Sequence, residues 1–340
     1  EYFPYQYYYE NSDTFVQPKY DMLEPTTKIK VMEPTETKFD VSVMNGYQLD
    51  TYREATQSKV DMQVMIQISN ISYPSSVDDI NYKKSNLGFL QVFKRTSETS
   101  NKLKVEYIDN TNRILEYDKI GNYSSKMKRI LEHVEKCQGS MIIYSKYLWS
   151  GVIPMCIALE EMGFDKHDNA NLLSKRGKKK TKSNYIVLSG TEMLTSKNSD
   201  ELSIFNSAEN ANGDLIKIAI INDVATEGVS FQNVREIHIL EPWYNMNRNK
   251  QIIGRGVRYL SHHTLPPEKR NVRVHSHMNM IKDDDVETID YRRYRISVEK
   301  DSEIAQVETV LKTNAIDCIL NKDLNSVREM KGQMIDSNGG

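Results

Sequence analysis

Two arginines in the segment NKQIIGRGVRYLSH (249–262) have the type and spacing to bind an anion. Arg255 and Arg258 are three residues apart, so on a helix they lie on one face. Gly254 and Gly256 flank Arg255 and keep bulk away from its guanidinium. Two such groups on one face suit a triphosphate, because each presents a planar fork of donors. The alternative from spacing alone is a pair of surface arginines bound to carboxylates.

A polar loop, NDVATEGVSF (222–231), follows an apolar strand predicted at 216–223. In an open parallel sheet, ligands bind outside the carboxyl ends of the strands. Gly228 in this loop allows the backbone to come close to a ligand. The loop is therefore a second candidate for the same site.

The segment SKRGKKKTK (174–182) holds six cations and no anion. Such runs are most often solvated loops, but this one is the best candidate in the chain for binding a polyanion such as nucleic acid. Its members are Lys175, Arg176, Lys178, Lys179, Lys180 and Lys182.

The elements that must position these residues alternate between short apolar strands and amphipathic helices. Such alternation predicts an α/β fold, a parallel sheet with helices on both faces. The predicted strands are 140–144, 185–190, 216–223, 235–240 and 271–275. The predicted helices run from the serine cap of SSKMKRILEHVEKC (124–137), over 148–164 and over 246–259.

The chain divides by pattern into three regions. Residues 1–118 form a linker and accessory region, poorly regular and partly extended over 1–45, helical over 45–70 and polar and irregular over 71–118. Residues 119–280 form the α/β domain, and 281–340 a helical extension. Apolar residues on one side of that extension need a partner surface.

Composition describes an ordinary polar protein of 340 residues with a formal charge of −2, 39% hydrophobic and 27% charged residues. No apolar run reaches about 18 residues, so no membrane span is expected. The start lacks a signal segment and an initiator Met, which suggests a piece of a longer protein. Cys137, Cys156 and Cys318 are far apart and odd in number, which indicates free thiols in a reducing compartment.

Histidines cluster in SHH (261–263) and HSH (275–277). On a strand, the two rings of HxH point to the same face. No cysteine lies nearby, so we interpret them as polar loop and strand-end residues and expect no metal.

The motifs together resemble a family. QIIGRGVR (251–258) resembles motif VI, QxxGRxxR, of superfamily-2 helicases and nucleic-acid translocases. NDVATEGVSF lies where motif V belongs, and GSMIIYSKYL (139–148) looks like motif IV. Over about 119–321, the chain is most similar to helicase-like ATPases of large cytoplasmic DNA viruses. That group includes the poxvirus early transcription factor small subunit and nucleoside triphosphatase I.

This resemblance implies a role for each matched residue. Arg258 corresponds to the arginine finger that reaches the γ-phosphate from the second RecA-like lobe, and Arg255 to the other phosphate-facing arginine. Gln251, and Gly254 of the same motif, are expected near the nucleotide or the lobe interface. Gly228 and Glu227 correspond to motif V, which links the nucleic-acid path to the ATP cleft.

The sequence departs from the family in two positions and one larger feature. Ile252 stands where many members have a polar residue, and Ser230 where the DEAD-box branch has Asp, which puts ribose contacts from motif V in doubt. The chain contains no GxxxxGKS or GxxxxGKT phosphate loop and no DExx box after an apolar strand. It is therefore expected to be the C-terminal part of a longer or split ATPase and to be inactive alone, with the Mg²⁺ ligands on the other lobe.

The resemblance implies an ATP-dependent helicase or translocase in viral transcription, located in the virion or host cytoplasm. Expected partners are nucleic acid, DNA rather than RNA, the other ATPase lobe, and RNA polymerase or a second transcription-factor subunit. One alternative is a non-catalytic transcription-factor subunit that uses the lobe for docking. Another is a nucleotide-independent nucleic-acid-binding protein that depends on the 174–182 run.

Overall fold

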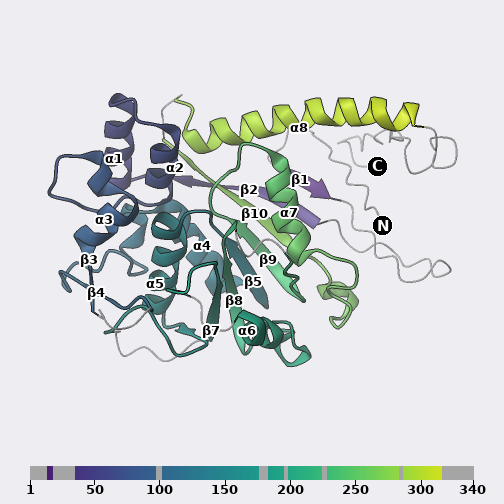
Figure 1. Cartoon of the computed structure of the whole chain (residues 1–340), viewed down its shortest axis with the longest axis horizontal. Coiled ribbons are helices and arrows are strands. Elements are labelled where there is room, and N and C mark those ends of the chain that lie inside the picture. Colours follow the sequence, from purple (N-terminus) through teal and green to yellow (C-terminus); the bar gives the residue numbers. More distant parts are fainter. Residues whose placement is uncertain are drawn as a thin grey trace, which may run out of the picture.

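A computed structural model describes residues 14–17, 35–96, 102–175, 183–194, 198–223, 228–282 and 286–315, with only the backbone described at 14–17, 35–38, 198–199 and 268. At its centre is an eight-stranded sheet in which all neighbours are parallel except β1 and β2 (Figure 1). In sheet order the strands are β1 (Thr14–Gln17), β2 (Thr35–Val43), β10 (Arg273–Met280), β9 (Val234–Ile239), β5 (Ser140–Tyr144), β8 (Ile216–Ile221), β7 (Asn184–Leu188) and β6 (Asp165–Lys166).

Helices cover both faces of this sheet, which confirms the predicted α/β fold. One face packs against α4 (Ser125–Lys136) and α5 (Ile153–Met162). The other packs against α6 (Asn198–Phe205) and α7 (Met246–Gly256). Continuous apolar runs such as SMIIY form β5 because a central parallel strand is buried on both sides.

Local sequence signals set the ends of two of these helices. Ser124 caps α4 by accepting a hydrogen bond from the backbone N–H of Met127. Pro154 lies in the first turn of α5, and Gly163 ends that helix in the left-handed conformation with φ of 97°.

The prediction of a poorly regular, partly extended region over 1–45 misses that 35–43 are a regular strand. These residues form β2, which pairs in parallel with β10 along its full length. The burial pattern explains the error, since polar Asp40 and Ser42 are buried whereas Val41 and Val43 are about 40% exposed. In this part of the strand the polar residues are buried and the apolar residues are exposed, which is the reverse of the usual pattern.

Residues 46–118 are more ordered than predicted. The helical prediction over 45–70 is confirmed as α1 (Gly46–Gln57) and α2 (Met62–Asn70). The stretch 71–118, predicted to be irregular, contains α3 (Ser85–Val92) and the two-stranded sheet of β3 (Phe93–Arg95) and β4 (Val105–Tyr107).

An aromatic group inside 71–118 joins the α4–α5 side of the core. Phe89 stacks on Phe93 with ring centroids 4.5 Å apart, and Tyr107 lies 4.4 Å from Phe93. These rings share one hydrophobic cluster with α4 and α5, so residues on both sides of 118/119 belong to one core. The domain boundary at this point stays a prediction.

The described part of the C-terminal extension contains one long helix, α8 (Ile289–Asn314), seen in Figure 1 as the yellow helix that runs past the sheet. Its first turns are buried against the lobe, whereas Ile304, Val307, Val310 and Leu311 are 42–65% exposed. The predicted apolar residues of the extension that fall within α8 are thus open to solvent. Among the described residues, no helix combines the length and the apolarity needed to cross a membrane.

Short turns of helix complete the described structure. These are Ile80–Lys83, Ile120–Asn122, Leu148–Val152, Ala208–Asn210 and Pro267–Lys269.

Candidate functional site

Arg255 and Arg258 reach the same stretch of backbone, residues 228–230. Arg255 Nη1 donates to the carbonyl oxygen of Val229 at 3.3 Å, and Arg258 Nη1 donates to Ser230 Oγ. The backbone N–H of Phe231 bonds to the carbonyl of Arg255 at 2.9 Å and holds the two segments together. The structure therefore brings together the two loops that the sequence singled out.

The prediction that both arginines lie on one helix face is wrong, because α7 ends at Gly256. Arg258 lies beyond the helix end, where its Nε donates to the carbonyl of Gly254 at 3.0 Å. Its side chain is exposed, and within the described residues it forms no ion pair with a carboxylate. This arrangement keeps its charge available to a ligand.

The glycines around Arg255 serve different purposes. A side chain at Gly256 would meet Ile237 Cδ1 at 3.0 Å, so this glycine lets α7 lie close to the sheet. Gly254 faces open space. Gly228 has φ of 76°, in the left-handed region, so it is required by conformation and not by crowding. Glu227 lies outside the described residues.

Arg248 is part of this site and was missed by the sequence analysis. Its Nη2 lies 2.6 Å from Asp223 Oδ1, just after the carboxyl end of β8, and its Nη1 donates to Gln251 Oε1 at 3.4 Å. Gln251 is exposed. The spacing of three from Gln251 and seven from Arg255 places Arg248 on the same side of α7 and would have revealed it.

A buried carboxylate lies at the carboxyl end of β9. Glu241 accepts hydrogen bonds from the backbone N–H of Lys146, from Ser145 Oγ at 2.9 Å and from Asn70 Nδ2 at 3.0 Å. Burial raises the pKa of Glu241 to about 7, although the bond from Lys146 and the charge of Lys126 oppose the shift. No motif pointed to this residue.

Only one member of the predicted cation cluster falls within the described residues. Lys175 is exposed, and its Nζ lies 3.5 Å from Glu106 Oε1. The other five predicted members, Arg176, Lys178, Lys179, Lys180 and Lys182, lie outside the described residues. Their role in nucleic-acid binding stays a prediction.

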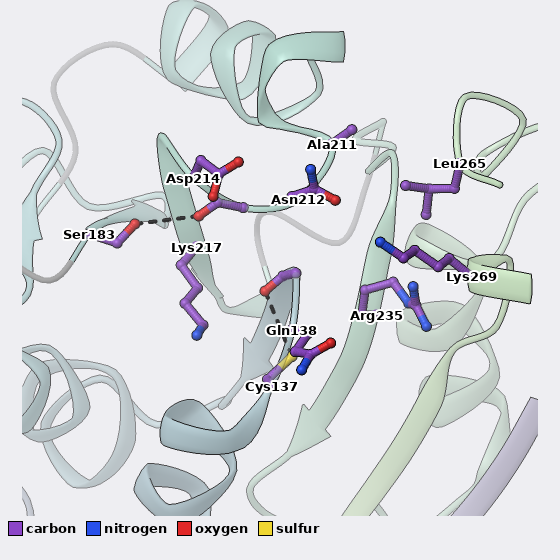
Figure 2. Close-up of a pocket in the computed structure, with 12 residues that line it drawn as sticks. Cys137, Gln138, Ser183, Ala211, Asn212, Asp214, Lys217, Arg235, Leu265 and Lys269 are labelled. Atoms are coloured by element: carbon purple, nitrogen blue, oxygen red, sulfur yellow. Dashed lines mark hydrogen bonds between the residues drawn. The ribbon is translucent and has the colours of Figure 1, made fainter.

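A polar pocket of about 590 Å³ lies around the amino ends of β5, β7, β8 and β9 (Figure 2), whereas Asp223 and Glu241 lie beyond the carboxyl ends of their strands. Lys217, Arg235 and Lys269 line it together with Asp214 and Cys137. Burial raises the pKa of the Cys137 thiol to about 12, so it is not a nucleophile at neutral pH. None of the predicted site residues lines this pocket.

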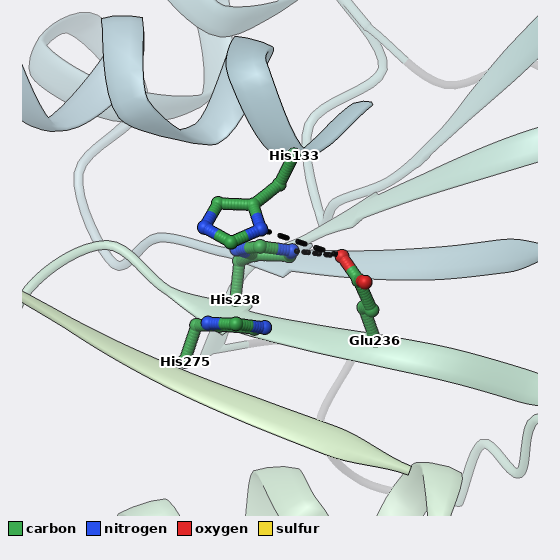
Figure 3. A group of neighbouring side chains, drawn as sticks. All are labelled: His133, Glu236, His238 and His275. Carbon is green, nitrogen blue, oxygen red and sulfur yellow. Dashed lines mark hydrogen bonds and ion pairs between the residues drawn. The ribbon is translucent and has the colours of Figure 1, made fainter. Parts of the chain in front are cut away.

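The interpretation of the histidines as loop and strand-end residues is wrong for 275 and 277. Both lie inside β10 and are buried, as is His238 on the neighbouring β9. With His133 of α4 and Glu236 they form a compact group, shown in part in Figure 3. The sequence analysis missed His133, His238 and Glu236 because only the fold brings them to HSH.

Comparison with known proteins identifies relatives in large DNA viruses. A protein of Acanthamoeba polyphaga mimivirus, provisionally described as an ATP-dependent RNA helicase, is 28% identical over 323 residues, 94% of this chain and 50% of the relative. A provisionally described helicase of Invertebrate iridescent virus 3 is 29% identical over 216 residues, covering 62% of this chain and 22% of the relative. A termination factor NPH-I homolog of African swine fever virus is 27% identical over 236 residues, covering 59% and 33%.

Other comparisons add little. The crystal structure of the C-terminal part of the Fun30 ATPase domain matches 77% of this chain and 88% of its own, with 13% identity and a TM-score of 0.42. No protein-family model matches the chain. The chain spans half or less of the length of the curated relatives named above.

The parallel sheet carries two joined segments that resemble helicase motifs V and VI. The resemblance to helicase-like proteins of large DNA viruses, read first from the motifs, is confirmed by these relatives.

Proposed function

We propose that this chain is the arginine-bearing lobe of an ATP-dependent helicase or nucleic-acid translocase. The observation that carries the proposal is the meeting of Arg255 and Arg258 at residues 228–230. Two guanidinium groups converge there on a polar loop, and that of Arg258 is exposed. Such a pair suits the charge that develops on a transferring phosphoryl group.

In this proposal, ATP and Mg²⁺ bind between this lobe and a second lobe that carries the phosphate loop and the metal ligands. Arg258 exchanges its contacts with Ser230 and Gly254 for phosphate oxygens when the lobes close. Arg255 binds a second oxygen of the γ-phosphate, because the guanidinium group of one arginine cannot reach all three of its oxygens. Arg248 and Gln251 continue the same side of α7 toward the carboxyl edge of the sheet.

The proposed setting is viral transcription, with nucleic acid and RNA polymerase or a second transcription-factor subunit as partners. The family resemblance led us to expect DNA, whereas one matched relative is described as an RNA helicase and another as a termination factor homolog. Binding of matched DNA and RNA strands to the two-lobe enzyme, measured at one salt concentration, decides between them.

The test is steady-state ATP hydrolysis by the two-lobe enzyme carrying Arg258→Ala. Turnover should fall by about 10³–10⁵, as for other arginine fingers, which corresponds to about 4–7 kcal/mol of transition-state stabilisation. Arg258→Lys should restore little, since a point charge lacks the planar fork. Nucleotide-free binding of nucleic acid should stay the same.

Arg292→Ala is the matched control, because Arg292 is an exposed arginine on α8. The chain alone, which has no phosphate loop, should show no turnover. If Arg258→Ala kept full turnover but lost nucleic-acid binding, Arg258 would belong to the strand path and the proposal would be wrong.

A further inference from the structure

Four potential metal-binding side chains from three elements meet on the α4 face of the sheet (Figure 3). His133 comes from α4, Glu236 and His238 from β9, and His275 from β10. Alternation along β9 puts residues 236 and 238 on one face, and the β9–β10 register places His275 beside His238. One ligand atom from each of the four lies within 4.8 Å of the others.

Each of the three imidazole rings has one nitrogen hydrogen-bonded to a residue outside the group, so its other nitrogen faces the centre of the group. Asp40 Oδ2 lies 2.6 Å from His133 Nε2 and 3.1 Å from His275 Nδ1. His277 Nε2 lies 2.9 Å from His238 Nδ1. The atoms that remain are His133 Nδ1, His275 Nε2 and His238 Nε2.

These three ring nitrogens lie close to the Glu236 carboxylate or have no other protein partner. Glu236 Oε2 lies 3.2 Å from His238 Nε2 and 3.9 Å from His133 Nδ1. Its other oxygen, Oε1, is 3.7 Å from Arg273 Nη1. His275 Nε2 is buried and has no hydrogen-bond partner among the described residues. A buried nitrogen without a partner is costly unless something else binds it.

The carboxylates around these rings favour a bound cation. Asp40 and Glu236, 7% and 5% exposed, supply negative charge close to the rings.

We propose that His133, Glu236, His238 and His275 bind one Zn²⁺ ion, with Asp40 orienting two of the imidazoles. Imidazole nitrogen and carboxylate oxygen suit zinc, whereas Mg²⁺ prefers oxygen ligands alone. Tetrahedral bonds of about 2.0–2.1 Å require ligand atoms about 3.3 Å apart. The His238–Glu236 separation is 3.2 Å and the His133–Glu236 separation 3.9 Å, so the ligands would move closer together around the ion. Four protein ligands leave no open position, so the site is structural and not catalytic.

Such an ion would fasten α4 to the β9–β10 pair. Its position also matters for the arginine site, since Ile237 lies between two of the ligands and packs under Gly256 on the other face. The site is nevertheless separate from the arginines, and the zinc proposal does not depend on ATP hydrolysis.

The experiment is metal binding by the chelator-treated chain, with Zn²⁺ titrated by calorimetry and Co²⁺ by absorption spectroscopy. We expect one ion per chain, a strong visible Co²⁺ band typical of tetrahedral coordination, and a higher melting temperature with Zn²⁺. His133→Gln and Glu236→Gln should each abolish tight binding. Asp40→Asn should weaken it by about 10–100-fold, as the loss of such an orienting partner does.

His263→Gln is the matched control, because His263 is an exposed loop histidine whose ring bonds to the carbonyl of Leu260 and lies outside the proposed site. It should bind Zn²⁺ as the unchanged chain does. If the unchanged chain takes up no Zn²⁺, or His133→Gln binds it equally tightly, the proposal is wrong. A weak six-coordinate Co²⁺ spectrum of the unchanged chain would also overturn it, even if a variant failed to fold.

Discussion

Replacing Lys126 by Met should cost this fold more stability than any exposed substitution on the same helix. Lys126 and Asp290 have fully buried side chains, and Lys126 Nζ lies 2.9 Å from Asp290 Oδ2. The same ammonium donates to Asn70 Oδ1 at 2.8 Å. One cation therefore joins the first turn of α4, the first turn of α8 and the last residue of α2.

The expected magnitude follows from what the substitution leaves behind. Breaking a buried pair by removing one partner typically costs about 3–5 kcal/mol, because the other charge stays buried. Asp290 Oδ2 keeps two donors, Ser69 Oγ at 2.6 Å and the backbone N–H of Asn279 at 3.0 Å. These remaining hydrogen bonds favour a loss at the lower end of that range, about 3 kcal/mol. Asn70 Oδ1 loses its partner, which adds about 1 kcal/mol. We expect a loss of about 4 kcal/mol in the free energy of unfolding.

The assay is urea unfolding followed by circular dichroism, comparing midpoints at unchanged slope. Lys136→Met is the control, because Lys136 is exposed in the last turn of α4 and should cost at most about 1 kcal/mol. Asp290→Asn combined with Lys126→Met should cost less than the two single changes added, by about 0.5–3 kcal/mol. A Lys126→Met loss no larger than the Lys136→Met loss would refute the reasoning.

Two further predictions concern pH and salt. Burial raises the pKa of Glu241 from 4.5 to about 7, so the folded chain favours the protonated form and the free energy of unfolding should fall by about 3 kcal/mol as pH rises through this interval. Glu241→Gln should flatten that part of the profile relative to the unchanged chain in urea unfolding, and an identical profile would contradict the assignment. Changing all six cations of the 174–182 run to Ser should weaken nucleic-acid binding by the two-lobe enzyme and lower its log–log salt slope by about 0.7–0.9 for each phosphate that is no longer neutralised. Unaltered affinity and slope would show that the run is a solvated loop.

The sequence was sufficient to predict the central strands because their signals are local, whereas the role of the two arginines stays a prediction. Five predicted strands correspond to β5, β7, β8, β9 and β10. Each is a short apolar run or a run in which polar and apolar residues alternate. Arg255 and Arg258 stood out by spacing and by flanking glycines. The helix end at Gly256 was missed, since no proline or cap residue marks it and packing against Ile237 favours that glycine.

The parts that could not be predicted depend on interactions between distant segments. Asp40 meets His275 across 235 positions of the chain, and Lys126 meets Asp290 across 164. In β2, a charged residue is buried because its partners come from α4 and β10, which no periodicity within β2 reveals. The histidines of HSH were dismissed as a metal site for the same reason, because two of the other proposed ligands are on β9 and one is on α4.

Strand β9 shows how the two proposals can be separated by experiment. Its alternation sends Glu236 and His238 toward α4 and sends Ile237 and Ile239 toward the face that α7 covers. A zinc ion would thus stiffen the strand beneath Gly256 without touching an arginine. If both proposals hold, chelation should lower the melting temperature of the chain but leave the hydrogen bonds of Arg258 with Ser230 and Gly254 intact. Loss of the proposed arginine-dependent turnover in zinc-free enzyme assayed with Mg²⁺ restored would instead mean that the position of α7 is set through β9.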